Sequence, residues 1–177
     1  VYDLTPYVAP GKSCLVTIRV DNRIKEINVG PDSHSVTDQT QGNWNGIVGK
    51  IELQAMPRVF FEDIQVYPDL SEKKAVVRMN VCASAVVKGE IVLSAKSFNT
   101  DINHEVAPVC RTVAIRKGDN PVEMELPMGA GFLTWDEFVP ALYRLTATLK
   151  SAKQVEERHV QFGMLEFTID DKWFYVN

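Results

Sequence analysis

The stretch that decides the fold is residues 41–53, which read QGNWNGIVGKIEL. Its second half alternates, with Ile47, Gly49, Ile51 and Leu53 on one face and Val48, Lys50 and Glu52 on the other. This period of two predicts a half-buried β-strand. In the first half, Trp44 stands among two asparagines and two glycines, residue types that favour turns and positive φ. We therefore expect a tight loop that carries an indole and two carboxamides directly into a sheet.

This loop is the candidate binding site of the sequence, because an indole face beside amide groups can stack on a sugar ring and hydrogen-bond to it. The candidate residues are Asp38, Gln41, Asn43, Trp44 and Asn45. The competing interpretation places Trp44 in the core, where tryptophan is usually highly buried and its indole N–H has a partner. Composition alone favours core packing over ligand contact.

Length and composition describe an ordinary globular chain. The 177 residues are 45% hydrophobic and 24% charged, which suits one large or two small domains. The net charge of −4 gives no electrostatic support for nucleic acid or an anionic membrane as partner. No apolar run has the length of a membrane span. Residues 1–4 lack the features of a signal peptide, and the absence of an initiator Met suggests a processed or excised piece.

The three cysteines, Cys14, Cys82 and Cys110, cannot all pair within one chain. Cys14 and Cys82 lie in apolar, strand-like runs, where a thiol behaves as a small hydrophobic group. We expect no structural disulfide. The compartment stays open, with a bacterial periplasmic or secreted protein as the expectation.

Further strands are expected on both sides of residues 41–53. Residues 14–22 alternate and predict a strand, residues 23–40 a long loop, and residues 117–121 a turn. After a domain boundary near residue 57, strands are predicted over 59–67, 74–83, 89–96, 109–116, 122–126, 141–150 and 156–168. No amphipathic helix is apparent. About seven strands over roughly 110 residues predict an all-β fold with an immunoglobulin-like sandwich.

Three groups of residues, in order along the chain, carry a family resemblance. They are residues 3–8 with Gly11 and 16–22; residues 44–53; and residues 135–137 and 140–143 with Phe162-Gly163-Met164 and Glu166-Phe167. Together they resemble glycoside hydrolase family 2, which contains β-galactosidases, β-glucuronidases and β-mannosidases. The first two groups are similar to the late strands of the family's sugar-binding jelly roll. The third is similar to the end of its immunoglobulin-like second domain.

The resemblance implies three parts: the C-terminal part of a jelly roll (1–57), an immunoglobulin-like β-sandwich (58–168), and the start of a linker into an absent catalytic (β/α)₈ barrel (169–177). It implies that both catalytic carboxylates lie in that barrel. The chain is then the non-catalytic, cofactor-free portion of a β-galactosidase-like hydrolase of O-glycosyl bonds. Its expected partners are that barrel in cis and, through the parent enzyme, carbohydrate. The alternative is an independent carbohydrate-binding or adhesion module without hydrolase activity.

The remaining residues with catalytic or binding potential have simpler interpretations. Glycoside hydrolysis needs two carboxyl groups about 5–10 Å apart, one with a raised pKa. The acidic pairs close in sequence are Asp136-Glu137, Asp170-Asp171, Glu123/Glu125 and Glu156-Glu157, and we interpret them as solvated surface groups. His34, His104 and His159 lack metal-ligand spacing, so neither a metal site nor a catalytic residue is predicted.

Two expectations concern surfaces. Trp173, Phe174 and Tyr175 cluster near residue 177, where they would pack against the barrel or, without it, form an exposed apolar patch. Residues 1–57 offer only three or four strands, whereas a jelly roll hides its edges with about eight. Unpaired edges recruit other chains, which predicts a homodimer through this half of the chain.

Overall fold

The computed structural model describes residues 2–21, 46–151 and 154–177, and the chain divides into two compact units, Val1–Gln54 and Ala55–Asn177. The described residues contain strands, turns and irregular segments but no helix. Among them, accordingly, no helix could cross a membrane. The predicted all-β class is confirmed.

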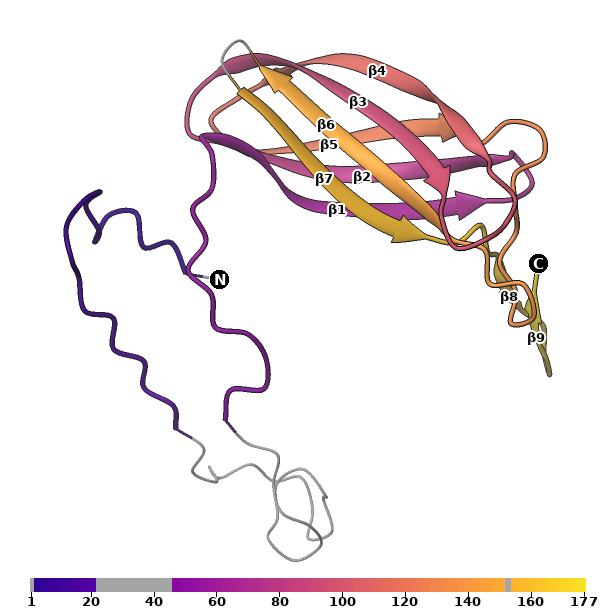
Figure 1. The fold of residues 1–177 in the computed structure, drawn as a ribbon, viewed down its shortest axis with the longest axis horizontal. Helices are drawn as coiled ribbons and strands as arrows, with labels where there is room; N and C mark the ends of the chain where they lie inside the picture. Colours follow the sequence, from indigo (N-terminus) through magenta and orange to yellow (C-terminus); the bar gives the residue numbers. More distant parts are fainter. Residues whose placement is uncertain (1, 22–45, 152–153) are drawn as a thin grey trace, which may run out of the picture. The chain divides into compact units, whose positions relative to one another are not determined.

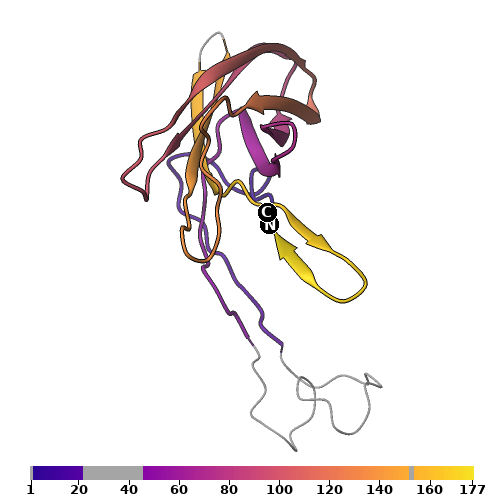
Figure 2. The same cartoon turned by 90° about the vertical axis from the view of Figure 1, so that its right-hand side faces the viewer.

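The strands of the second unit form a sandwich and a separate hairpin (Figure 1). They are β1 (Val59–Asp69), β2 (Lys74–Ala83), β3 (Val87–Ser97), β4 (Glu105–Ile115), β5 (Gly118–Pro127), β6 (Tyr143–Ser151), β7 (Gln154–Phe162), β8 (Phe167–Ile169) and β9 (Phe174–Val176). One sheet has the order β1-β2-β5 and the other β4-β3-β6-β7, with antiparallel pairs throughout. β8 pairs only with β9, and Figure 2 shows this hairpin extending away from the sandwich.

The core lies between the two sheets and follows from the alternation of the sequence. Every second residue of β2 is buried, and Val77 and Val81 are completely inaccessible to solvent. The facing sheet contributes Leu93 from β3 and Leu145 from β6, which are equally buried. Because side chains of a strand alternate between its faces, the intervening residues form a polar outer surface. The sequence predicted about seven strands in this part of the chain, and the sandwich contains seven, β1 to β7.

The strand order resembles a constant-type immunoglobulin sandwich in six of seven strands. In that arrangement the fourth strand pairs with the fifth. Here β4 pairs with β3 instead and extends the opposite sheet. β4 and β5 are consequently edge strands of different sheets, and the opening between them lies along one side of the sandwich.

Side chains join the two sheets across both open sides. On the β1–β7 side, Gln154 Nε2 donates to the Val59 carbonyl at 2.5 Å, and the Phe61 N–H donates to Glu156 Oε2 at 2.9 Å. On the β4–β5 side, Arg111 Nη1 donates to the Glu123 carbonyl at 2.9 Å. These bonds use backbone groups that an edge strand would otherwise present to another chain.

The strands expected in the first unit are absent from its described part. Residues 14–21 and 46–53 have no strand pairing, and their apolar side chains are exposed, Leu15 by 93%. An alternating segment becomes a stable strand only when neighbouring strands satisfy its backbone and a packed layer covers its apolar face. The described residues supply neither partner strands nor a packed layer. The alternating pattern alone therefore predicted strands that these residues do not form.

Three boundaries in the second unit also differ from the predictions. β4 begins at Glu105, four residues before the predicted start at residue 109. Residues 118–121, expected in a turn, belong to β5, where Pro121 is tolerated because edge strands do not need every N–H. The strand predicted over 156–168 is two strands, β7 and β8, separated at Gly163. A Cβ at Gly163 would lie 2.8 Å from Trp135 Cβ, so Gly163 permits the close passage of the Trp135 loop.

Candidate functional site

The predicted sugar-binding residues Asp38, Gln41, Asn43, Trp44 and Asn45 lie outside the described residues, as does His34. Their role stays a prediction. The candidate site that the structure does describe is a different one, built by the loops at one end of the sandwich.

The acidic pair of β5 is occupied by ion pairs on the outer face of its sheet. Glu123 accepts from Arg78 Nε at 2.7 Å, and Glu125 accepts from Lys74 Nζ at 2.8 Å. Arg78 and Glu123 occupy directly paired positions of β2 and β5, whereas Lys74 contacts Glu125 diagonally, because Glu125 is paired with Val76. Cross-strand pairs of opposite charge stabilise a sheet face, which accounts for both carboxylates without a catalytic role.

The other acidic pairs hold turns and strand edges. Glu156 bonds the Phe61 N–H and Arg158 Nε, and Glu157 lies 3.2 Å from His159 Nε2. Asp170 accepts from the Lys172 N–H, the Tyr175 hydroxyl and the Trp173 N–H, and these bonds lower the pKa of its carboxyl. A general acid would need a raised pKa. The bonds of Glu156 and Asp170 account for these two carboxylates as structural groups.

Among the described residues, the histidines and cysteines show no metal-binding arrangement. Residues 2–21, 46–151 and 154–177 contain no group of three His, Cys, Asp or Glu side chains that could hold an ion. His104 instead contacts Tyr143 edge-on, with ring centroids 5.6 Å apart. Cys14 and Cys110 are exposed thiols, and Cys82 is half-buried, where burial raises the pKa of its thiol.

The candidate site is a set of exposed apolar side chains at the end of the sandwich where β7 ends. It comes from the β3–β4 loop, the β5–β6 loop and the β8–β9 hairpin (Figure 1). We call it the apolar end surface, and its members are Phe98, Ile102, Phe138, Val139, Phe167, Ile169, Trp173, Phe174 and Val176. Single exposed apolar residues are ordinary, but gathered ones mark interaction sites.

The hairpin contributes one wholly apolar face. Phe167 pairs with Val176, and Ile169 pairs with Phe174, so these four side chains project to the same side. The rings of Phe167 and Phe174 stack with centroids 5.4 Å apart, and Phe174 is still 68% exposed. Thr168 and Tyr175 lie on the other face, where the Tyr175 hydroxyl donates to Asp170 Oδ2.

The hairpin is tied at its base to the β5–β6 loop. Asn177 Nδ2 donates to the Trp135 carbonyl at 2.7 Å, while the Asn177 N–H and side-chain oxygen bond Glu166. Thr134 forms a parallel bridge with Met164, and the Trp135 N–H donates to the Met164 carbonyl. Residue 177 is thus fixed beside the apolar end surface.

Phe138 projects from a rigid turn within the β5–β6 loop. Asp136 Oδ1 accepts from the Phe138 N–H at 2.8 Å and from the Val139 N–H at 2.7 Å, an Asx turn. Asn99 clamps the following residues, because its side chain bonds the Pro140 carbonyl and the Leu142 N–H. Phe138, 86% exposed, is therefore presented to solvent by a backbone with little freedom.

A buried tyrosine supports the same loop from below. Tyr143 begins β6 and is completely buried, and its hydroxyl accepts from the Leu133 N–H at 2.8 Å while pairing with His104 Nδ1 at 2.9 Å. Burial raises the pKa of Tyr143, partly opposed by the Leu133 bond. Immunoglobulin-type sandwiches have a tyrosine at the start of the sixth strand whose hydroxyl bonds to the backbone of an earlier residue, the tyrosine corner. Tyr143 matches this arrangement.

The sequence predicted only part of the apolar end surface. The Trp173–Tyr175 cluster was expected as a patch, whereas Phe98, Ile102, Phe138 and Val139 were not. The one available signal was Asp136, since Asp two residues before an apolar residue in a Pro-containing segment indicates an Asx turn.

The described strands define the class of the fold, an antiparallel β-sandwich, and the comparisons with known proteins agree. The family model of glycosyl hydrolases family 2 matches residues 59–164, more than half of the chain. The chain therefore belongs to glycosyl hydrolase family 2, as the resemblance of its three groups of residues predicted.

Solved structures of family members share the sandwich. A family 2 member from Bacteroides cellulosilyticus has 18% identity over 68% of this chain and 17% of its own, with a TM-score of 0.57. A β-glucuronidase from Parabacteroides merdae has 20% identity over 68% of this chain and 16% of its own, with a TM-score of 0.50. At these identities the likeness shows the fold alone. The matched part spans about a sixth of those chains. A search of curated proteins gave no match.

Proposed function

We propose that the chain is the non-catalytic β-sandwich portion of a glycoside hydrolase, β-galactosidase-like, that cleaves O-glycosyl bonds. In this proposal residues 1–57 are the C-terminal part of a sugar-binding jelly roll, 58–168 the immunoglobulin-like sandwich, and 169–177 the start of the connection to a catalytic barrel. Membership of the family supports the proposal at the level of the class. The sugar and the linkage are expectations from the resemblance.

The observation that carries the proposal is the apolar end surface. It combines an apolar hairpin face with Phe138 and Val139 on a clamped turn, and residue 177 is bonded beside it. Any residues that follow Asn177 in a longer chain begin against this surface. Apolar surface that gathers on rigid elements is the kind that another domain covers. We propose that the catalytic barrel of the same polypeptide is that domain.

Activity measurements test whether catalysis requires the proposed barrel and is absent from this chain alone. The pure 177-residue chain is expected to give no turnover of nitrophenyl β-galactoside, β-glucuronide or β-mannoside. The product of the complete reading frame that contains it is expected to hydrolyse one of them. Hydrolysis by the 177-residue chain alone would contradict the proposal, and so would a complete product without a barrel domain.

A carbohydrate-binding module is the second candidate, favoured by one observation. The indole of Trp173 is 65% exposed on a short hairpin, and exposed indoles can stack on sugar rings. Calorimetric titration of the chain with galactosides and mannosides distinguishes the two candidates. Saturable binding that is lost in Trp173→Ala or Trp44→Ala would favour the module, and no heat of binding would favour the scaffold.

A further inference from the structure

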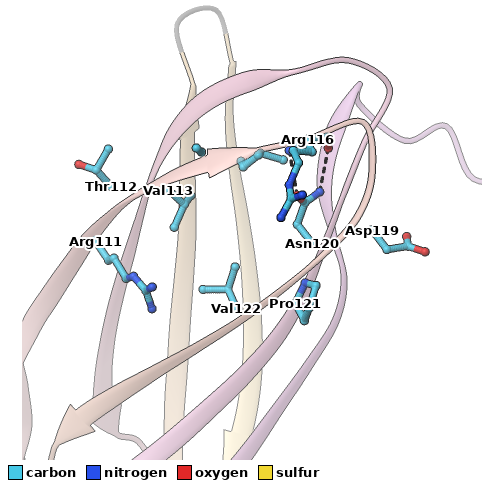
Figure 3. A pocket seen from close by; sticks show the side chains of 10 residues that line it. Arg111, Thr112, Val113, Arg116, Asp119, Asn120, Pro121 and Val122 are labelled. Atoms are coloured by element: carbon cyan, nitrogen blue, oxygen red, sulfur yellow. Dashed lines mark hydrogen bonds between the residues drawn. The ribbon is translucent and has the colours of Figure 1, made fainter.

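A groove lies between β4 and β5, on the open side of the sandwich (Figure 3). It has a volume of about 320 Å³, at the lower end of the range for small-molecule sites. Its lining is Arg111, Thr112, Val113, Ala114, Ile115, Arg116, Asp119, Asn120, Pro121 and Val122. The groove exists because β4 pairs with β3 and leaves its other edge facing β5 without a ladder between them.

Arg111 spans the groove from one sheet to the other. Its Nη1 donates to the Glu123 carbonyl of β5 at 2.9 Å, which connects the guanidinium to the facing sheet. Glu123 uses its side chain elsewhere, in the ion pair with Arg78, so Arg111 forms no ion pair with it. The other N–H groups of Arg111 have no partner among the described residues and lie at the groove.

The backbone of Arg116 is held by the side chain of Asn120. The Arg116 N–H donates to Asn120 Oδ1 at 2.8 Å, and Asn120 Nδ2 donates back to the Arg116 carbonyl at 2.8 Å. The same Nδ2 also bonds the Gly118 and Val81 carbonyls, which anchors the turn to β2. In Figure 3 the guanidinium of Arg116 extends into the groove beside Asn120.

Neither guanidinium has a carboxylate partner in the part of the chain that the structure describes. By contrast, Arg78 and Arg158 are paired with glutamates. Asp119 is the single acidic residue of the lining, and Figure 3 shows it pointing away from both arginines. Two unpaired arginines at one groove are notable in a chain whose net charge is −4.

The groove also has an apolar floor. Val113 and Ile115 are buried core residues that contribute to the lining of the groove, and Val122 of β5 is half-buried. A ligand that satisfies this site needs an acidic group for the guanidinium donors and an apolar face for the floor. Arginine forms planar, two-point hydrogen bonds with carboxylates, and such charge-assisted bonds are the strong ones.

We propose that the β4–β5 groove binds the carboxylate of a compact ligand. Arg116 is the main contact of this carboxylate, and Arg111 is the second contact. The carboxylate comes either from a sugar acid, whose ring has an apolar face, or from an aromatic acid. This site is separate from the apolar end surface and does not depend on the proposed glycosidase function.

Nuclear magnetic resonance titration of the full 177-residue chain tests the site. Sodium glucuronate and sodium benzoate are added at constant ionic strength, with glucose and benzamide as neutral counterparts. We expect saturable shifts of the Arg116 and Asn120 backbone amides and of the Arg116 Nε–H with at least one acid. The acid that binds more tightly identifies the source of the carboxylate.

Variants distinguish specific binding at the groove from nonspecific attraction of anions to positive charge. Arg116→Gln is expected to weaken binding about tenfold or more, as the loss of a charge-assisted bond requires. Arg116→Lys keeps the positive charge but loses the planar guanidinium. We expect its affinity to lie between that of the parent chain and that of Arg116→Gln. Arg58→Gln is the matched control, because Arg58 also lacks a carboxylate partner among the described residues but lies outside the groove.

Unchanged unfolding midpoints of the variants show that each remains folded. The proposal is overturned if neither acid gives saturable shifts, if the neutral compounds shift the same amides equally, or if Arg58→Gln weakens binding as much as Arg116→Gln.

Discussion

Gly163 lies directly against Trp135, so closely that a Cβ added to Gly163 would stand 2.8 Å from Trp135 Cβ. This contact brings the end of β7 under the β5–β6 loop, where the Trp135 N–H bonds the neighbouring Met164 carbonyl. It thereby joins the sandwich to the base of the β8–β9 hairpin. The contact explains why the chain leaves β7 at a glycine.

Gly163→Ala is expected to destabilise the second unit by about 1–3 kcal/mol, because the added methyl group must displace the indole or the backbone. Urea unfolding followed by tryptophan fluorescence measures the change. Gly49→Ala is the control, since nothing lies within 4 Å of a Cβ at Gly49. Equal stability of Gly163→Ala and the parent chain would contradict the close contact.

Glu156 is expected to matter more than its neighbour Glu157. Glu156→Ala removes the acceptor of the Phe61 N–H and the partner of Arg158, which should lower the free energy of unfolding by about 1–3 kcal/mol. Glu157→Ala removes an exposed pair with His159 and should change it by less than about 0.5 kcal/mol. Chemical unfolding of both variants compares them, and equal losses would contradict the bond across the β1–β7 side.

Tyr143 should make stability depend on alkaline pH. Burial raises the pKa of Tyr143 above its ordinary value of 10.0, so the folded state favours the neutral phenol. Its contribution is fully present below pH 10 and is lost as the pH rises through the folded pKa, because the unfolded chain then releases the proton first. Thermal unfolding between pH 8 and 11 should show a steeper loss for the parent chain than for Tyr143→Phe.

Tyr143→Phe should also be less stable at neutral pH. The Leu133 N–H loses its acceptor, which is expected to lower the free energy of unfolding by about 1–3 kcal/mol. Parallel stability curves for the two proteins above pH 9 would contradict the raised pKa.

Exposed apolar residues of the first unit predict self-association. Leu15, Val16, Ile18 and Val20 are all exposed, as are Ile51 and Leu53. We expect the 177-residue chain to form a dimer that Ile18→Lys dissociates. Val155→Lys is the control, because Val155 is exposed on β7 in the second unit. Light scattering after size exclusion measures the mass, and a monomeric parent chain would contradict the prediction.

The sandwich was accessible from the sequence because each strand carries its own period-two pattern. In β2, burial follows the alternation of residues 74–83 almost residue by residue. The same reasoning failed at residues 14–21, where the pattern is equally clear but the described structure contains no neighbouring strand. Alternation shows which face a strand would bury, whereas pairing depends on the presence of a partner.

The candidate surfaces were less predictable because they depend on which loops meet. Phe138 and Phe98 are distant in sequence, and their loops meet through the bonds of Asn99 to residues 140 and 142 and through the Phe98 N–H, which donates to the Leu142 carbonyl. In the sequence alone, Arg111 and Arg116 have the pattern of ordinary charged surface residues. Their common groove arises from the pairing of β4 with β3, which the sequence pattern leaves undetermined.

The most direct test of the proposed scaffold compares two valines at opposite ends of the sandwich. Val139, 59% exposed, belongs to the apolar end surface, and Val86, 79% exposed, lies in the β2–β3 loop at the other end. In the 177-residue chain, Val139→Asp and Val86→Asp should each change stability by less than about 0.5 kcal/mol.

Thermal unfolding of the complete enzyme then decides the matter. Val139→Asp should destabilise the complete enzyme by about 1–3 kcal/mol, because a charge would be buried in the contact with the barrel, while Val86→Asp should leave it unchanged. If Val139→Asp leaves the unfolding of the complete enzyme unaltered, the apolar end surface is not where the sandwich supports the catalytic domain.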